Sequence, residues 1–317
     1  MQSKNQTFDL SGTNFVYGDA LLLDHNDKGG NDTFTLTGNS SVLYGDSQTM
    51  TDTARGGNDV LVANGNLNFL VGDADLMQGA SAGGNDSLTT IGDQNFIICD
   101  AVQIHGTSTG GNDSCTATGN GNSLFGDAFD MFATSIGGDD TLAASGNGNF
   151  LVGDAYDMLV ASRGGDDSLS VTGDNNKLFG DAWFMYDTSS GGDDRLTATG
   201  TGNVLYGDAQ SLFGAASGGA DTFVFGSANG TATIADFRAS DGDVIELVTA
   251  QDAAGAALSW DDLDSNGNGV LDDGDAWVAV GGSTEIDLGA LAGGPAGVNV
   301  VTVAGVTNLM VDDFLFA

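Results

Sequence analysis

Proline and basic residues are scarce in this sequence of 317 residues. It has one proline, and its 7 Lys and Arg residues stand against 44 Asp and Glu, so the formal net charge is −37. A chain this acidic repels nucleic acid and anionic lipid surfaces and attracts cations. High charge often indicates disorder, but 40% of these residues are hydrophobic and they recur at regular intervals. We therefore expect a folded protein that binds cations and does not bind nucleic acid.

Long apolar runs, cysteine and histidine are also lacking. No run approaches the ~18 apolar residues of a transmembrane helix, and residues 1–5 contain no signal-peptide core. Cys99 and Cys115 take positions that other repeats fill with glycine or an apolar residue. This is typical of substitutions within a repeat rather than of a disulfide framework, with a bridge between neighbouring coils as the alternative. The two histidines, His25 and His105, neither recur nor lie in a zinc-like motif, so we expect no enzyme of that kind.

What the sequence does contain is a strict repeat. A Gly-Gly pair returns every 27 residues, from Gly29 to Gly218. Such regular spacing predicts structural units stacked on one another, so that equivalent residues form ladders. An Asp follows each pair: Asp32, Asp59, Asp86, Asp113, Asp140, Asp167, Asp194 and Asp221.

Each 27-residue repeat divides into three segments of nine, with one apolar column in each. In the repeat that starts at Gly137 these columns are represented by Leu142, Leu151 and Met158, which we expect to point inward. The first segment alternates apolar and Thr or Ser residues, which is the period of a strand. We therefore predict an all-β fold, a right-handed parallel β-solenoid (β-roll or β-helix) of about eight coils with a mixed C-terminal capping domain. An incomplete coil, residues 8–28, opens it.

Two further ladders are polar. One is an amide column, interrupted by Ser41, whose side chains we expect to bond to the coils above and below; it comprises Asn14, Asn68, Asn95, Asn122, Asn149, Asn176 and Asn203. The other is an Asp that follows Gly in every repeat but one, where Asp100 follows Cys99; it comprises Asp19, Asp46, Asp73, Asp100, Asp127, Asp154, Asp181 and Asp208.

Stacked aspartates need a compensating charge. Carboxylates about 5 Å apart repel by roughly 1 kcal/mol per pair even in a water-like dielectric, and more when half buried. The basic residues are too few to neutralise them, and hard oxygen ligands select calcium, so several Ca²⁺ ions are expected. We assign as ligands all eight Asp of the Gly-Gly repeats and, as a second contribution, Asp46, Asp73, Asp127, Asp154, Asp181 and Asp208. The alternative is that these residues only cap turns.

These motifs resemble a known family. Gly-Gly-Asn-Asp-Thr-Phe at 29–34 and Gly-Asn-Gly-Asn-Ser-Leu-Phe-Gly-Asp at 119–127 are similar to the nonapeptides of RTX (repeats-in-toxin) proteins, over roughly residues 8–248. The resemblance implies a calcium-bound β-roll, with Asp32 and its equivalents at the calcium-binding position. It also implies a secreted protein, exported by type I secretion machinery, that folds on extracellular calcium. This sequence departs from the family in having three segments per coil rather than two, and Asn where the second segment of the motif has Asp.

We divide the chain into a repeat solenoid (1–220), a cap (221–248) and a C-terminal region (249–317). The cap resembles the segment that closes the β-roll of serralysin-type proteases, and its aromatic residues Phe223, Phe225 and Phe237 are expected in the core. The ending, residues 311–317, is acidic then apolar. That is similar to an uncleaved type I secretion signal, and an ordinary final strand is the alternative.

The C-terminal region also contains an EF-hand-like loop. An entering helix is expected over 253–263 and a strand over 276–280. Position 12 is Asp275 rather than the longer Glu, which favours weak binding as in extracellular modules. The predicted ligands are Asp264, Asn266, Asn268, Val270, Asp272 and Asp275, and an acidic solvent-exposed turn is the alternative.

The sequence thus favours a secreted, non-enzymatic calcium-binding protein with a structural, surface-layer or matrix and adhesion role. Its further partners would be cell-surface polysaccharide or other copies of itself. One alternative is ice binding through the threonine columns Thr35/Thr37, Thr116/Thr118 and Thr197/Thr199. Others are a secreted signalling or pore-forming protein, and a polysaccharide-acting β-helix enzyme using Asp130 and Asp157.

Overall fold

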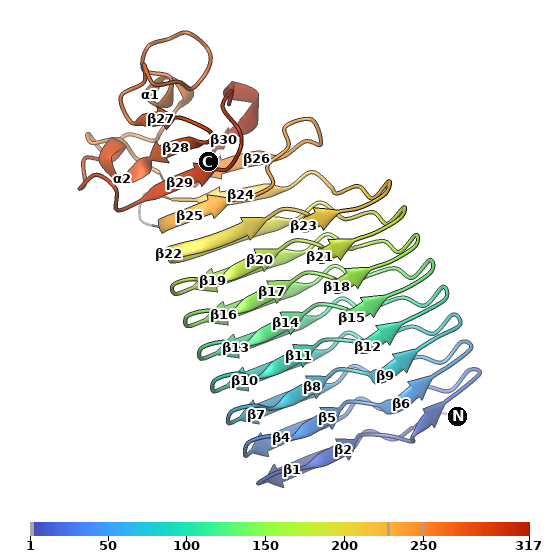
Figure 1. Ribbon diagram of the computed structural model, residues 1–317. Helices are drawn as coiled ribbons and strands as arrows, with labels where there is room; N and C mark the ends of the chain where they lie inside the picture. The colour runs from blue at the N-terminus through green and yellow to red at the C-terminus, as the bar shows by residue number, and fades with distance from the viewer. Residues whose placement is uncertain (1–2, 227–228, 249) are drawn as a thin grey trace.

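A computed structural model describes residues 3–226, 229–248 and 250–317. It shows a parallel β-solenoid of about eight coils of about 27 residues, which confirms the predicted fold class. In Figure 1 the coils stack into a rod, and the C-terminal region lies at one end of it. Residues 1–2, in the segment without a signal-peptide core, and residue 249, the expected start of the C-terminal region, lie outside the described residues.

Each coil contributes one strand to each of three parallel stacks. Stack 1 contains β1 (Thr7–Ser11), β4 (Thr33–Thr37), β7 (Val60–Asn64), β10 (Ser87–Ile91), β13 (Ser114–Thr118), β16 (Thr141–Ser145), β19 (Ser168–Thr172), the first part of β22 (Arg195–Tyr206), β24 (Thr222–Phe225), β26 (Val244–Leu247) and β30 (Phe314–Phe316). Stack 2 contains β2 (Phe15–Tyr17), β5 (Val42–Tyr44), β8 (Phe69–Val71), β11 (Phe96–Ile98), β14 (Ser123–Phe125), β17 (Phe150–Val152), β20 (Lys177–Phe179), the second part of β22, β25 (Gly230–Ile234) and β29 (Val300–Val303). Stack 3 contains β3 (Leu22–Leu23), β6 (Ser47–Met50), β9 (Ala74–Met77), β12 (Ala101–Ile104), β15 (Ala128–Met131), β18 (Ala155–Met158), β21 (Ala182–Met185) and β23 (Ala209–Leu212).

The pairing register equals the sequence repeat. Leu61 lies opposite Leu88 between β7 and β10, and Met131 lies opposite Met158 between β15 and β18. Because a shift by one residue would turn every inward side chain to the other face, the apolar columns hold this register. It first slips at Thr201 and Asn203 of β22, where this strand pairs with β25 beyond the last complete repeat.

The three predicted apolar columns are the core. Leu142 and Leu151 belong to one cluster between stacks 1 and 2, and Met158 belongs to a second cluster built from the Met and Ala columns of stack 3. All three side chains are fully buried. Because each coil contributes the same residues at the same level, the core continues unbroken along the rod.

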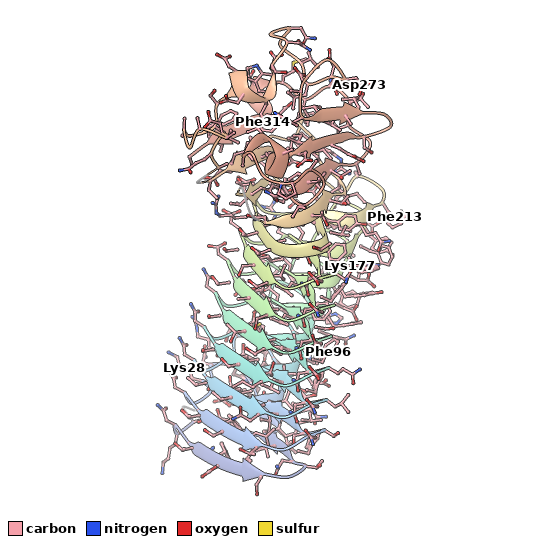
Figure 2. The ribbon with its side chains drawn as sticks, turned by 90° about the vertical axis from the view of Figure 1, so that its left-hand side faces the viewer. Lys28, Phe96, Lys177, Phe213, Asp273 and Phe314 are labelled. Carbon is pink, nitrogen blue, oxygen red and sulfur yellow. A yellow bond between two sulfur atoms is a disulfide. The ribbon has the colours of Figure 1, made fainter. Side chains whose placement is uncertain are left out.

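Aromatic side chains join stack 3 to the outer face of stack 2. Phe129 and Tyr156 stack with ring centroids 4.8 Å apart, and Tyr156 and Trp183 stack at 5.8 Å. They pack on buried residues of stack 2 such as Phe125 and Phe179. The third segment of the repeat, which the RTX pattern does not explain, therefore forms a third wall with its own apolar contacts. Phe96 and Phe213 lie along the same side of the rod in Figure 2.

The asparagine column is structural, as predicted. Oδ1 of Asn122 accepts a hydrogen bond of 2.8 Å from the backbone N–H of Asn95, and the bond repeats one coil further on with Asn149. In several coils the Nδ2 group also donates, as Asn95 does to Oδ1 of Asn122 at 3.2 Å. An amide thus satisfies an acceptor and a donor with its own atoms, and it carries no charge.

The two cysteines are joined by a disulfide, with Cα atoms 6.6 Å apart. Both are substitutions within ladders, as predicted, since Cys115 lies between Leu88 and Leu142 in the inward column of stack 1. The bridge between neighbouring coils, which the sequence allowed as the alternative to unpaired cysteines, is therefore present.

The C-terminal region continues the two stacks that enclose the core. β29 pairs with β25, β30 pairs with β26, and β28 (Thr284–Asp287) and β27 (Val278–Val280) add antiparallel strands. Its helices are short, α1 (Trp260–Leu263), α2 (Leu288–Leu291) and the 3₁₀ turn η1 (Val311–Asp313). No helix in the described part of the chain is long and apolar enough to cross a bilayer.

The cap core is confirmed, because Phe223, Phe225 and Phe237 are all buried. Of the strand expected over 276–280, Val278–Val280 form β27 and residues 276–277 form a turn, and the helix expected over 253–263 is wrong except for α1. Gln251 and Ala257 form an antiparallel bridge around a turn with Gly255 at a φ of 82°. This local pairing outweighs the helix propensity of the alanines, because propensity differences are only tenths of a kcal/mol per residue.

Candidate metal centre

The Asp at the second position after each Gly-Gly pair, such as Asp59 after Gly56-Gly57, is buried and accepts a hydrogen bond from the coil before it. Asp59 is 1% exposed, and its Oδ1 accepts a 2.6 Å hydrogen bond from the backbone N–H of Asp32. The same bond recurs through the series to Asp221. We call these residues the first Asp column. One carboxylate oxygen of each member therefore serves the backbone.

The Asp of the Gly-Asp pairs forms a second buried column. Asp46 is 0% exposed, and its Oδ2 accepts a 2.7 Å hydrogen bond from the backbone N–H of Gly57, in the next Gly-Gly pair. Every later member accepts the equivalent bond, always from the residue 11 positions on. The turn between stack 3 and stack 1 is thus tied back to the carboxylate.

The second oxygen of most of these carboxylates is buried without any partner. The unpartnered atoms of the first column are Oδ2 of Asp32, Asp59, Asp86, Asp113, Asp140, Asp167, Asp194 and Asp221. Those of the second column are Oδ1 of Asp46, Asp73 and Asp100 and Oδ2 of Asp127, Asp154 and Asp181. Buried polar atoms in proteins nearly always have a partner, so two rows of orphaned oxygens point to a missing one.

The glycines bring backbone carbonyls to the same places. A Cβ on Gly45 would strike both the carbonyl oxygen of Gly72, one coil on, and Oδ2 of Asp59. We call this space in front of the Gly-Asp glycine the corner position. A Cβ on Gly56, the first glycine of a Gly-Gly pair, would strike the carboxylates of Asp46 and Asp73. Both glycines are needed because carboxylate and carbonyl oxygens converge on the points that any side chain would fill.

Burial makes these carboxyl groups weak acids. Desolvation raises the pKa of Asp59 to about 8 and of Asp154 to about 7. It raises the pKa of Asp73 well above its ordinary value, and the charges of Asp86 and Asp100 raise it further. The charges of each column therefore raise pKa values in the other. A divalent cation between them would favour the ionised forms that burial and repulsion now oppose.

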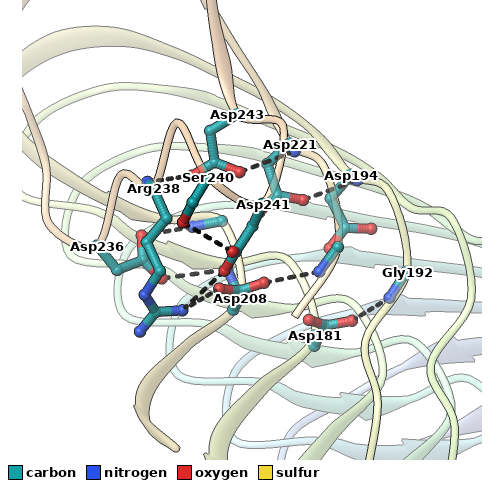
Figure 3. Close-up of polar contacts among 12 residues, drawn as sticks. Asp181, Gly192, Asp194, Asp208, Asp221, Asp236, Arg238, Ser240, Asp241 and Asp243 are labelled. Atoms are coloured by element: carbon teal, nitrogen blue, oxygen red, sulfur yellow. Dashed lines mark hydrogen bonds and ion pairs between the residues drawn. The ribbon is translucent and has the colours of Figure 1, made fainter. Parts of the chain in front are cut away.

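At the C-terminal ends of the two columns, side chains of the cap bind the last carboxylates and backbone groups (Figure 3). Arg238 donates from Nη1 to Oδ2 of Asp208 at 2.7 Å, the last member of the second column. Asp243 extends the first column, because its Oδ1 accepts from the backbone N–H of Asp221 at 3.1 Å. Asp236 accepts from the backbone N–H groups of residues 207 and 208. Asp243 thus repeats a bond of the coils outside their 27-residue period, whereas Asp236 accepts with its carboxylate where the coils use backbone carbonyls.

The structure adds three candidate ligands, Asp100, Asp236 and Asp243, that were not among those expected from the sequence. Asp100 was not among the expected ligands because Cys99 replaces its glycine, yet its carboxylate is buried like the others and accepts from Gly111 at 2.7 Å. Asp236 and Asp243 lie outside the 27-residue period. Their only sequence signal is their place in the cap, each next to a hydrophobic residue.

The donor set suits a hard cation. Carboxylate and carbonyl oxygens are the ligands of calcium, and neither histidine nor sulfur is part of either column. Within the described ranges no three His, Cys, Asp or Glu side chains surround one point in a metal-binding arrangement. A site along the columns would therefore hold at most two carboxylates, and backbone carbonyls such as that of Gly72 would supply further ligands.

The EF-hand-like loop brings its predicted residues together, but it is already hydrogen-bonded internally. The carboxylate of Asp264 accepts from the backbone N–H groups of residues 267, 268 and 269. The side chains of Asn266 and Asn268 donate to Asp272, which lowers the pKa of that carboxyl group. Asp275 accepts from the backbone of Asn266 at 3.1 Å. Val270 stays a predicted ligand through its carbonyl. Calcium binding by this loop stays a prediction. Its carboxylates accept hydrogen bonds within the loop, so it lacks the rows of unpartnered oxygens found in the two Asp columns.

The other candidate residues are also placed by the structure. Asp130 and Asp157 are neighbours in stack 3, as predicted, and burial together with Asp130 raises the pKa of Asp157. The outer threonines of stack 1 share two columns, but non-threonine residues such as Val62 and Ala143 interrupt them.

No family model, no curated protein and no solved structure matches the chain. The candidate site therefore depends on the geometry of the two Asp columns.

Proposed function

We propose that this chain is a secreted calcium-binding protein of the RTX type, whose solenoid folds when calcium occupies the two Asp columns. The observation that carries the proposal is the double row of buried carboxylate oxygens without partners. Turn capping uses only the oxygen that accepts from the backbone, so it gives no role to the second oxygen of each carboxylate, which is buried without a partner.

Charge explains why folding would depend on the ion. The net charge is −37, and the carboxylates of the columns are buried beside one another. Without a cation, these groups must either hold protons or repel, and both oppose folding near neutral pH. A ligand that binds only the folded state adds its binding free energy to the stability.

The extracellular setting is supported by the disulfide between Cys99 and Cys115, since disulfides persist mainly in oxidising environments. Millimolar calcium is available there. Export by type I machinery and a structural, surface-layer or adhesion role remain part of the proposal, as expected from the resemblance of the repeats. The regular three-walled rod suits a spacer or scaffold.

Circular dichroism of the purified full chain tests the proposal. In EDTA at pH 7.5 we expect the β spectrum to be largely lost, and millimolar CaCl₂ should restore it. Magnesium at the same concentration is the control, and it should restore less because it demands a smaller octahedral site. An unchanged β spectrum in EDTA, together with no bound calcium by equilibrium dialysis, would reject the proposal.

A further inference from the structure

The column of Gly-Asp glycines is broken once, at Cys99. We propose that the Cys99–Cys115 disulfide takes the place of one calcium ion, so that this level of the ladder is held by a covalent bond and its corner position binds no metal. This inference rests on the proposed function, because it concerns the occupancy of the same ladder.

The other levels define what the corner position contains. In front of Gly72 lie the carbonyl oxygen of Cys99 and Oδ2 of Asp86, and in front of Gly126 lie the carbonyl oxygen of Gly153 and Oδ2 of Asp140. Because glycine has no Cβ, these two oxygens can approach its backbone closely, and the carboxylate oxygen there has no hydrogen-bond partner. By the repeat, the corresponding space at Cys99 is bounded by Gly126 and Asp113.

A cysteine side chain occupies that space. Like the column glycines above and below it, Cys99 has no positive φ, so by the repeat its Cβ points toward this space. It is fully buried and joined to Cys115, two residues after Asp113 on the next coil. The sulfur atoms lie within the core cluster between stacks 1 and 2. Calcium prefers oxygen, so a disulfide is no substitute ligand for it.

The backbone hydrogen bonds differ next to Cys99. In the coils on both sides, the N–H of the column Asp bonds to the carbonyl of the next column Asp, as Asp73 does to Asp100 at 2.8 Å and Asp127 does to Asp154 at 3.0 Å. Between Asp100 and Asp127 this bond is absent among the described residues, and only the N–H of Ala101 reaches the Asp127 carbonyl. One backbone hydrogen bond is therefore missing at the level where a side chain replaces glycine, while the flanking bonds, from Cys99 to Phe125 at 2.9 Å and from Ala101 to Asp127 at 3.0 Å, keep ordinary lengths.

The disulfide also differs from an ion in what it requires. An ion occupies a corner position only while calcium is present, whereas the disulfide links the coils of Cys99 and Cys115 at every calcium concentration. This pair lies near the middle of the repeats, so it would hold two adjacent coils in register before calcium binds.

The test counts calcium ions. In the double variant Cys99→Gly/Cys115→Leu, which restores the residues of the other repeats, we expect one more calcium per chain than in the disulfide-bonded wild type. Native mass spectrometry and equilibrium dialysis at saturating calcium give the count. An equal count would overturn the inference but leave the proposed function intact, whereas no calcium in either protein would overturn the proposed function itself.

A reciprocal variant guards against misfolding of the first. Gly153→Cys/Leu169→Cys places the same pair, with the same separation of 16 residues, two coils further on. We expect it to form a second disulfide and to bind one calcium fewer than wild type. Circular dichroism in calcium verifies folding, and an unchanged ion count in either folded variant contradicts the substitution of disulfide for ion.

Discussion

Arg238 donates a 2.7 Å hydrogen bond to Asp208 and so places a cation of the chain against the last carboxylate of the second Asp column. The side chain of Asp208 is only 2% exposed, while that of Arg238 is 39% exposed. Among the described residues, the members of this column from Asp46 to Asp181 have no basic partner. The guanidinium thus occupies, at the end of the ladder, the role that we assign to calcium along its length.

Removing this cation should destabilise the cap. We expect Arg238→Gln to lower the free energy of unfolding in saturating calcium by about 1–3 kcal/mol, less than the cost for a fully buried pair because Arg238 is partly exposed. Urea unfolding followed by circular dichroism measures it. Arg163→Gln makes the same charge change at an exposed site and should cost under about 0.5 kcal/mol. Equal effects of the two substitutions would contradict the role given to Arg238.

The charge of Asp140, in the first Asp column, can be removed without losing its hydrogen bond to the backbone. In Asp140→Asn the amide oxygen can still accept from the N–H of Asp113, which now bonds to Asp140 Oδ1 at 2.7 Å. The charge that would hold an ion is lost, so we expect the number of bound calcium ions to fall by one or more. Titration calorimetry measures the count. The matched control is Asp139→Asn, an exposed neighbour in the same turn, which should bind as many ions as wild type.

The solenoid could be predicted because its information is periodic. Leu61, Leu88 and Cys115 recur at one position in successive repeats, and stacking places them opposite one another. The amide column followed from the same argument. The orphaned oxygens could not be predicted, since which oxygen of Asp59 bonds to the backbone depends on the turn conformation and not on spacing.

Features that depart from the 27-residue period were harder to predict from the sequence. Cys99 and Cys115 become neighbours only because the chain passes through stack 3 between them and returns to stack 1 one coil further on. The sequence could not decide between a bridge and two free thiols. Asp243 continues the first column 22 residues after Asp221, not 27, because the cap takes a shorter path between the same positions. The helix expected over 253–263 failed for a local reason, the turn at Gly255.

The calcium-free protein should be more stable in acid than at neutral pH. Burial raises the pKa of Asp32 from its ordinary 3.8 to about 6, that of Asp59 to about 8 and that of Asp221 to about 9. The folded chain then binds protons more tightly than the unfolded chain, so stability is greatest at about pH 4 and below. It falls as the pH rises above about 4 and stops falling near pH 9, where the last of these groups ionises in the folded chain. Circular dichroism in EDTA from pH 4 to 9 measures this. Stability that rises with pH in EDTA would contradict the raised values, and saturating calcium should remove most of the loss.

The amide column offers a test that is independent of metal. Asn122 is fully buried, and its Oδ1 accepts from the backbone and side chain of Asn95. In Asn122→Ala these donors lose their acceptor inside the protein, which costs about 1–3 kcal/mol for a buried unsatisfied group.

The control for this substitution lies two residues away. Asn120 also accepts a backbone hydrogen bond, from Asn147 at 2.9 Å, but its side chain is exposed and water can replace it. We expect Asn120→Ala to cost less than about 1 kcal/mol. Urea unfolding in saturating calcium compares the two, and the number of bound ions should be unchanged in both. A larger loss from Asn120→Ala would mean that the outer turn, rather than the buried amide ladder, holds the coils of stack 2 in register.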